Sequence, residues 1–391
     1  MSRILNLIAL SLAGMAFMLC AASGHAAPKK TKFTVLYSFE GNSTSGGSPF
    51  SSMIQDKAGN FYGTTTTGGT VGVGTVFKLA PDGTETVLHA FSDGSEGGIP
   101  FGGLVADSKG NLYGTTYSGG QPSCNCGVVF KVDTAGNESV LHTFLGGTDG
   151  ATPYDTLILD KQGNLYGTTT EGGGACNCGI VFKLSPKGKL TVLHVFAEGS
   201  DGAFPFAGVT LDGQGNLFGA TYQGGGTCDC GTIYKIDSAG NESVLYAFTG
   251  NSIDAAYPEA SLLMDKKGNL FGTTKFGGTS NGGTVFRLAP DLTETILHSF
   301  GAGSDGATAY AGVVADKKGD LYGTTINGGG HGVGMVFKLA PNGDETVLYN
   351  FANGNDGANP YGGLILGKKN AVYGTSAAAG VNGFGTVFEI R

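Results

Sequence analysis

A unit of roughly fifty residues is repeated seven times along this chain of 391 residues. Its clearest landmark is the motif Gly-Asn-Leu-Tyr-Gly-Thr-Thr. The aromatic residue of this motif lies at Tyr62, Tyr113, Tyr166, Phe218, Phe271, Tyr322 and Tyr373, so the spacings are 51, 53, 52, 53, 51 and 51 residues. A fixed period of this length is typical of solenoids, propellers and arrays. The repeat covers nearly the whole chain, which favours one domain over several.

Each unit is predicted to form four short antiparallel strands. In the second unit we expect them at residues 102–106, 111–116, 127–132 and 139–144, separated by turn signals such as Asp107-Ser108-Lys109-Gly110. The pattern has no helical period. A four-stranded unit repeated four to eight times is typical of a β-propeller blade. A β-solenoid is the alternative, but about 52 residues is too long for one coil, and capping units are missing from the sequence.

The two ends of the repeat region are expected to complete one blade together. The first strand, at residues 33–39, matches the fourth strand of a unit, and the last strand, at residues 386–390, matches the third. Pairing these strands would close a ring and remove its exposed sheet edges. The predicted fold is therefore all-β: a seven-bladed β-propeller with four-stranded antiparallel blades, closed by the N-terminal strand completing the last blade.

The first residues have the layout of a secretory signal peptide. Arg3 is followed by an apolar run over residues 4–22, and the small residues Gly24 and Ala26 precede a cleavage site after Ala26. We predict a signal peptide at residues 1–26, a single propeller at residues 27–391, and a secreted or periplasmic location. A retained membrane anchor is the alternative. After cleavage we expect no membrane association, because no other apolar run is long enough to span a bilayer.

The charge of the mature chain argues against nucleic acid as a partner. Removing residues 1–26 removes Arg3 and no acidic residue, which leaves 22 basic and 31 acidic residues and a net charge of −9. Nucleic acids and anionic membranes are bound by basic surfaces. We expect a monomer whose partner is a carbohydrate or a protein at the cell surface.

Six cysteines of the mature chain form three Cys-x-Cys pairs at one repeat position: Cys124 with Cys126, Cys176 with Cys178, and Cys228 with Cys230. An even number of cysteines in an exported protein favours disulfides. Adjacent blades would hold the pairs too far apart to cross-link. We therefore predict a disulfide within each pair. A metal site is the alternative, although zinc knuckles separate their paired cysteines by two to four residues and these pairs are separated by one.

The motifs Gly-Asn-Leu-Tyr-Gly-Thr-Thr and Gly-Thr-Val-Phe-Lys-Leu-x-Pro-x-Gly resemble those of the GloVer-type (choice-of-anchor) tandem-repeat proteins of bacteria. The resemblance covers residues 33–391. It implies an exported repeat protein with no well-defined activity. The order of the strands also resembles that of NHL-type and gluconolactonase-like propellers.

An acidic residue recurs in the connection between units, four places before a proline in most of them. The residues are Glu96, Asp149, Asp201, Asp254, Asp305 and Asp356. In a propeller these connections would lie around one mouth of the central channel, so the carboxylates are candidates to bind a cation or a polar ligand. Ordinary turn formation is the alternative, because Asp-Gly is a common turn dipeptide.

Two further residues carry a charge where the other units do not. Directly after the proline position, six units have an aromatic residue and the remaining unit has Glu259. At the next position, Asp155 stands where the other units have Ser, Gly or Ala. Because the repeat itself does not require these two charges, Glu259 and Asp155 are expected to mark one side of a ligand site at the channel mouth. Drift in a single copy is the alternative.

No catalytic signature accompanies these residues. The sequence has no Gly-x-Ser-x-Gly, His-Glu-x-x-His or phosphate-binding loop motif. We predict a binding or structural module with no catalytic residues and no cofactor, while a calcium ion in the channel is left open. A metal-dependent hydrolase or lyase, similar to the propeller lactonases, is the alternative.

Overall fold

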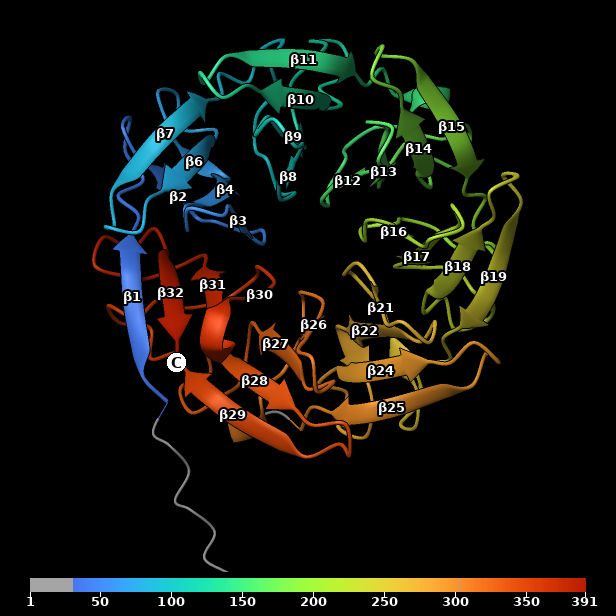
Figure 1. The fold of residues 1–391 in the computed structure, drawn as a ribbon. Helices are drawn as coiled ribbons and strands as arrows, with labels where there is room; N and C mark the ends of the chain where they lie inside the picture. The colour runs from blue at the N-terminus through green and yellow to red at the C-terminus, as the bar shows by residue number, and fades with distance from the viewer. Residues whose placement is uncertain (1–30, 302) are drawn as a thin grey trace, which may run out of the picture. The chain divides into compact units, whose positions relative to one another are not determined.

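The computed structural model describes residues 31–391 except Ala302, so the predicted signal peptide lies outside the described residues. Residues Thr31–Arg391 form one compact unit. Seven four-stranded antiparallel sheets are arranged in a ring (Figure 1), and this confirms the predicted seven-bladed propeller. No helix among the described residues is long and apolar enough to cross a membrane.

Each blade has the same order of strands, from the centre of the ring to its periphery (Figure 1). The innermost strands are β3 (Ile54–Gln55), β8 (Val105–Ala106), β12 (Ile158–Leu159), β16 (Thr210–Leu211), β21 (Leu263–Met264), β26 (Val314–Ala315) and β30 (Ile365–Leu366). The second strands are β4 (Phe61–Thr65), β9 (Leu112–Thr116), β13 (Leu165–Thr169), β17 (Leu217–Thr221), β22 (Leu270–Thr274), β27 (Leu321–Thr325) and β31 (Val372–Ser376). The third strands are β6 (Thr75–Leu79), β10 (Val128–Val132), β14 (Ile180–Leu184), β18 (Thr232–Ile236), β24 (Thr284–Leu288), β28 (Met335–Leu339) and β32 (Thr386–Ile390). The outermost strands are β7 (Glu85–Ala90), β11 (Glu138–Thr143), β15 (Leu190–Val195), β19 (Glu242–Ala247), β25 (Glu294–Ser299), β29 (Glu345–Asn350) and β1 (Phe33–Ser38). We number the blades 1 to 7 in this order, so that blade 7 contains β30, β31, β32 and β1.

Blade 7 is built from both ends of the chain. Strand β1 pairs antiparallel with β32, from Phe33 opposite Ile390 to Ser38 opposite Thr386. In Figure 1 the blue N-terminal strand lies beside the red C-terminal strand. The predicted closure is confirmed.

The hydrophobic core lies between neighbouring blades. A buried aromatic residue just after each outermost strand packs edge-to-face on one in the third strand of the next blade, as Phe91 does on Phe130. The ring centroids are 5.0–5.3 Å apart at all seven junctions. Because the junction made by Phe39 and Phe77 across the closing blade has the same geometry, the ring is closed by the same packing that joins the other blades.

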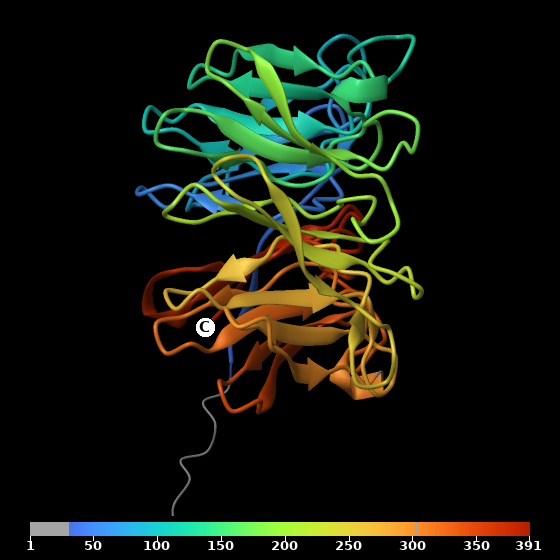
Figure 2. The same ribbon diagram turned by 90° about the vertical axis from the view of Figure 1, so that its right-hand side faces the viewer.

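Two kinds of loop share one face of the ring. The loop from an outermost strand to the next innermost strand is called here the crossing loop, and the loop from a second to a third strand is called the hairpin loop. Because neighbouring strands are antiparallel, both kinds emerge on the same face, and the remaining turns lie on the opposite face (Figure 2). Short pairings tie the two loops together, as β2 (Gly46–Gly47) with β5 (Thr67–Gly68) and β20 (Ala255–Ala256) with β23 (Phe276–Gly277). The 3-10 turns η1 (Gly147–Asp149) and η2 (Gly303–Asp305) lie in crossing loops, and η3 (Lys368–Asn370) lies after β30.

Candidate functional site

A backbone kink in every crossing loop directs one side chain of each blade into the channel. The kinked residues have φ between 51° and 60°, although none is glycine: Ser48, Ile99, Thr152, Phe204, Tyr257, Thr308 and Asn359. Thr152 shows how the kink is held. Its N–H donates to the Cys126 carbonyl of the preceding blade (2.8 Å), and its carbonyl accepts from the Thr170 N–H of its own blade (3.2 Å). Two hydrogen bonds thus stabilise a backbone conformation that is unfavourable for a β-branched residue.

Two positions after each kink, six blades place an aromatic ring at the channel. These rings pack on one another in an order that follows the blades: Phe206, Tyr154, Phe101, Phe50, Tyr361 and Tyr310, with neighbouring centroids 4.4–5.4 Å apart. We call this group the aromatic arc. The hydroxyls of Tyr154 and Tyr310 are 2.7 Å apart, which joins blades 3 and 6 across the channel. Burial raises the pKa of Tyr154 to about 12 and also raises the pKa of Tyr310, so both phenols are protonated at neutral pH.

The arc is interrupted at blade 5, and a cavity of about 320 Å³ lies beside the interruption. All six aromatic residues line this cavity together with Glu259. The cavity extends furthest along blades 5 and 6, where it reaches Leu263 and Val314 in the innermost strands, whereas blades 2 and 4 contribute only their aromatic residue. The position that lacks an aromatic ring therefore lies on one of the two blades along which the cavity extends furthest. We call this cavity the channel cavity.

Glu259 is one side of an ion pair within blade 5. Its Oε1 lies 3.1 Å from Nζ of Lys275, which occupies a hairpin-loop position where the other blades have Thr, Tyr, Ile or Ala. The side chain of Glu259 is only 7% exposed, and its Oε2 has no hydrogen-bond partner among the described residues. Burial raises the pKa of Glu259, and Lys275 opposes that shift. A buried carboxylate oxygen without a partner is energetically costly unless a ligand supplies a donor.

Lys275 was not singled out by the sequence analysis. Two signals could have found it: it departs from its own repeat, as Glu259 does, and it lies in the same unit. Its ammonium nitrogen is also 5.6 Å from the centroid of the Tyr222 ring in blade 4. The pair of charges in blade 5 thus replaces an aromatic residue and a neutral residue of the other blades.

Asp155 has a different role from Glu259, although both line the channel cavity. Its Oδ1 accepts from the Thr156 N–H (2.6 Å), and its Oδ2 accepts from the Gly208 N–H (2.7 Å) and from the Ser261 hydroxyl (2.7 Å). These partners belong to blades 3, 4 and 5. The hydrogen bonds account for Asp155 as a residue that joins three blades. Of the two carboxylates that line the channel cavity, Glu259 is therefore the one with an oxygen that has no hydrogen-bond partner among the described residues.

The six acidic residues of the crossing loops are not at the channel mouth, contrary to our expectation. None of Glu96, Asp149, Asp201, Asp254, Asp305 and Asp356 lines the channel cavity. They lie instead beside the outermost strands, where Asp149 Oδ2 accepts from the Leu145 N–H (3.0 Å) and lies 3.2 Å from His142 Nε2. Asp356 accepts from the Tyr349 hydroxyl (3.0 Å). These carboxylates therefore bond to groups no more than seven residues away in the sequence. This is the turn-forming role that we had given as the alternative.

The loop carboxylates explain why one position of the outermost strand holds either His or Tyr, since both can hydrogen-bond to a carboxylate. His89, His194 and His298 lie 3.0–3.1 Å from their loop carboxylate. Three of these pairs also approach a glutamate of the next outermost strand, which forms the groups His89–Glu96–Glu138, His194–Asp201–Glu242 and His298–Asp305–Glu345. These groups join neighbouring blades at the periphery, away from the channel cavity.

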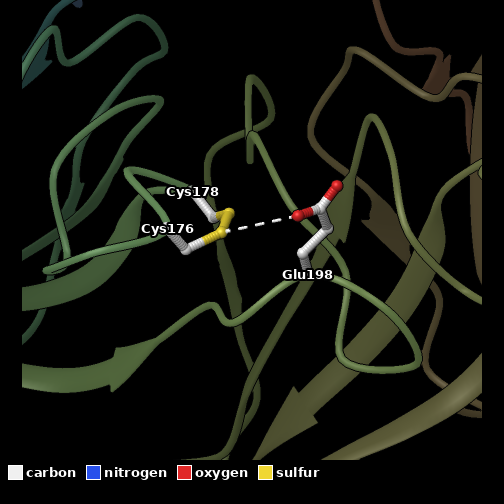
Figure 3. A group of neighbouring side chains, drawn as sticks. All are labelled: Cys176, Cys178 and Glu198. Atoms are coloured by element: carbon white, nitrogen blue, oxygen red, sulfur yellow. Dashed lines mark hydrogen bonds between the residues drawn. A yellow bond between two sulfur atoms is a disulfide. The ribbon is translucent and has the colours of Figure 1, made fainter.

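The cysteine pairs lie in the hairpin loops of blades 2, 3 and 4. Their sulfur atoms face each other within each pair, and the Cα atoms are 5.1, 5.2 and 5.1 Å apart, which is within the range that a disulfide requires. Figure 3 shows the pair Cys176 and Cys178 beside Glu198, whose Oε2 is 3.9 Å from Cys176 Sγ. The geometry is compatible with the predicted local pairing.

The sequence matches the family described as the Gloeobacter/Verrucomicrobia repeat over residues 25–177, 89–266 and 169–388. The chain belongs to the Gloeobacter/Verrucomicrobia repeat family. The predicted GloVer-type resemblance is therefore confirmed. No curated protein matches the sequence.

Solved structures with the same fold as this Gloeobacter/Verrucomicrobia repeat protein have low sequence identity. Virginiamycin B lyase from Staphylococcus aureus has 14% identity over 93% of this chain and 99% of its own, with a TM-score of 0.61. The extracellular domain of a proposed hybrid two-component system from B. thetaiotaomicron has 12% identity over 91% of this chain and 39% of that chain, with a TM-score of 0.60. A proposed 6-phosphogluconolactonase from Bacteroides uniformis has 17% identity over 81% and 88%, with a TM-score of 0.50. At these identities the similarity shows the propeller fold alone.

Proposed function

We propose that this repeat protein is an exported, monomeric binding module that holds a small ligand in the channel cavity at the face of the crossing loops. The observation that carries this proposal is the unpartnered Oε2 of Glu259, in a side chain only 7% exposed and on the wall of the channel cavity. Ligand sites are typically concave, mainly apolar, and provided with a few polar groups that converge on the ligand. The channel cavity has this composition.

The proposal is tested by filling the cavity. The double substitution Glu259→Phe with Lys275→Thr gives blade 5 the residue types that blade 1 has at Phe50 and Thr66. A mixture of sugars, amines, amino acids and organic acids is screened against both proteins by ligand-observed NMR. We expect ligands of the natural protein to be lost from the filled variant. Asp82→Asn, in an exposed turn of the opposite face, is the control and should retain them. Ligands that bind the filled variant equally well would contradict the proposal.

Export and the three disulfides belong to the same proposal. Cleavage after Ala26 would leave Ala27 as the first residue, which N-terminal sequencing of the secreted or periplasmic protein determines. An oxidising compartment would allow each Cys-x-Cys pair to close. Peptide mapping without reduction should recover each pair as an intact local bridge. Cross-linked peptides from different blades, or free thiols, would refute this pairing.

A metal-dependent hydrolase or lyase is the second candidate function. It rests on the propeller fold that this chain shares with virginiamycin B lyase. We rank it second because, of the two carboxylates that line the channel cavity, Asp155 already has hydrogen bonds to both oxygens. Elemental analysis of protein purified without chelator separates the two candidates. Stoichiometric calcium or zinc would favour the enzyme.

A further inference from the structure

The interruption of the aromatic arc suggests the chemistry of the ligand. We propose, on the basis of the binding function above, that the channel cavity takes a small organic cation whose flat ring occupies the missing seventh aromatic position and whose ammonium group binds Glu259. Three features of the cavity support this ligand: the shape of the vacancy, the balance of charge, and the hydrogen-bonding groups that are free.

The shape of the vacancy is set by the repeat. In blades 3 and 6 the corresponding positions hold Tyr154 and Tyr310, and the arc runs between them through blades 2, 1 and 7. Blade 4 continues the arc with Phe206, but no ring of blade 5 joins Phe206 to Tyr310, because the residue there is Glu259. A carboxylate side chain drawn towards Lys275 does not replace the area of an aromatic ring. A ligand ring at this position would contact aromatic neighbours on both sides, as the rings of the arc do.

The balance of charge favours a cation. Among residues 31–391 without Ala302, Asp155 and Glu259 are the acidic residues that line the channel cavity, and no basic residue lines it. Lys275 compensates one carboxylate through Glu259 Oε1. The pair of Glu259 and Lys275 is neutral overall, so Asp155 leaves the wall of the channel cavity with one net negative charge beside six aromatic rings. Aromatic rings attract cations through the negative charge density of their faces, and aromatic groups that surround an ammonium ion are an established recognition mode.

The free hydrogen-bonding groups point to a donor on the ligand. Glu259 Oε2 is a buried acceptor with no partner in the described part of the chain, whereas the hydroxyls of Tyr154 and Tyr310 are bonded to each other and Ser261 is bonded to Asp155. A neutral sugar needs several free donors and acceptors around its hydroxyls, and these residues do not supply them. One ammonium group needs one strong acceptor and tolerates apolar surroundings on its other sides.

The test compares two probes of the same shape. Benzylammonium and benzyl alcohol both carry a ring that could fill the seventh position, but only benzylammonium carries a charge. Their dissociation constants are measured by calorimetry or NMR titration for the natural protein, Glu259→Gln, the filled variant Glu259→Phe with Lys275→Thr, and the control Asp82→Asn. Thermal melting of each variant verifies that it is folded.

We expect benzylammonium to bind the natural protein and Asp82→Asn at least about tenfold more tightly than benzyl alcohol does. Glu259→Gln, which keeps the shape and removes the charge, should weaken benzylammonium by a similar factor, and the filled variant should bind neither probe. Equal affinity for both probes, no effect of Glu259→Gln, or no binding of benzylammonium would overturn the cation inference. The proposed binding function would still hold if other screened ligands bind the natural protein and do not bind the filled variant. If those ligands bind the filled variant equally well, the binding function is refuted together with the cation inference.

Discussion

At the scale of single residues, the informative positions are those where one blade has a different residue type from the other six. Tyr234 in β18 stands where the other six blades have phenylalanine. Its side chain is fully buried, and its hydroxyl has no hydrogen-bond partner among the residues that the structure describes. Unlike Glu259, it lies in the core between blades and lines no part of the channel cavity. We therefore interpret Tyr234 as an energetic defect of the scaffold, whereas Glu259 is the residue on which the proposed ligand site rests.

Tyr234→Phe is expected to stabilise the protein by about 1 kcal/mol, because it removes a buried hydroxyl that lacks a partner. The free energy of unfolding is measured by urea denaturation. Tyr246→Phe is the matched control: its hydroxyl donates to Asp254 Oδ1 (3.2 Å), so its removal should not stabilise. An unchanged or lower stability of Tyr234→Phe would show that the hydroxyl finds a partner in solution.

Gly179→Ala is expected to destabilise the protein by about 2 kcal/mol or more. Gly179 ends a hairpin loop with φ of 92°, and a Cβ atom there would lie 2.3 Å from the Thr169 carbonyl oxygen and 2.7 Å from Cδ of Pro205 in the next crossing loop. Gly213→Ala is the control, since φ is not in the left-handed region and no atom lies within 4 Å of its Cβ position. Its stability should change by about 0.5 kcal/mol or less, and comparable losses in both variants would refute the steric argument.

At the scale of elements, strand β1 closes the ring without a covalent connection to the other strands of blade 7. Its residue Phe33 packs on Phe388 of β32, with centroids 5.4 Å apart, and also on Tyr349 of blade 6. The strand therefore contributes both sheet pairing and the packing between the last two blades. Stability of the whole ring should depend on this one element.

Deletion of residues 28–40 is expected to cause aggregation or loss of cooperative melting, because it exposes the edge of β32 and removes Phe39 from the junction with blade 1. Size-exclusion chromatography and calorimetry measure the two effects. A chain that begins at residue 28 is the control. A deletion variant that remains monomeric and melts like this control would show that β1 is not needed for closure.

At the scale of the whole molecule, several glutamates around the ring have a pKa above the ordinary value. Glu138, Glu294 and Glu345 begin outermost strands and face the loop carboxylate of the preceding blade. Burial, together with the charge of that neighbouring carboxylate, raises the pKa of Glu138 and Glu294 to about 7 and that of Glu345 to about 8. His89 and His298 lie at two of these junctions and Tyr246 lies at the third.

The dependence of folding stability on pH follows from these raised pKa values. The folded state binds more protons than the unfolded state between the ordinary glutamate pKa of 4.5 and the raised values near 7 to 8. The stabilising contribution is therefore fully present below pH 4.5 and is lost as the pH rises through the folded pKa values. We expect a lower melting temperature at pH 8.5 than at pH 5. Replacing the three glutamates with glutamine should flatten this dependence, whereas Glu171→Gln at an exposed site should not. An equally steep dependence in the triple variant would refute the assignment.

The sequence alone determined the architecture of this protein, because in a repeat each unit carries the complete local information for its strands and turns. The motif around Tyr113 predicted a strand, and Asp107 predicted the turn that precedes it. In the structure Asp107 Oδ1 accepts from the Asn111 N–H (3.0 Å), as a turn-capping residue does. The unmatched strands at the two ends predicted closure. The strands and turns depend on contacts between residues that are near in sequence. The closure of the ring follows from the number of repeat units and from the strands left over at the two ends.

Only the tertiary structure decided where the candidate site lies, because its position depends on how far each side chain of a crossing loop reaches from the periphery to the channel. Asp149 is held at the periphery by partners within seven residues, while Tyr154, five residues later, meets Tyr310 across the ring. The kink at Thr152 lies between these two residues, and its left-handed φ is stabilised by a hydrogen bond that Thr152 donates to another blade. No local pattern encodes such a contact. The cavity beside Glu259 likewise forms only once the ring has closed, because residues of all seven blades line it.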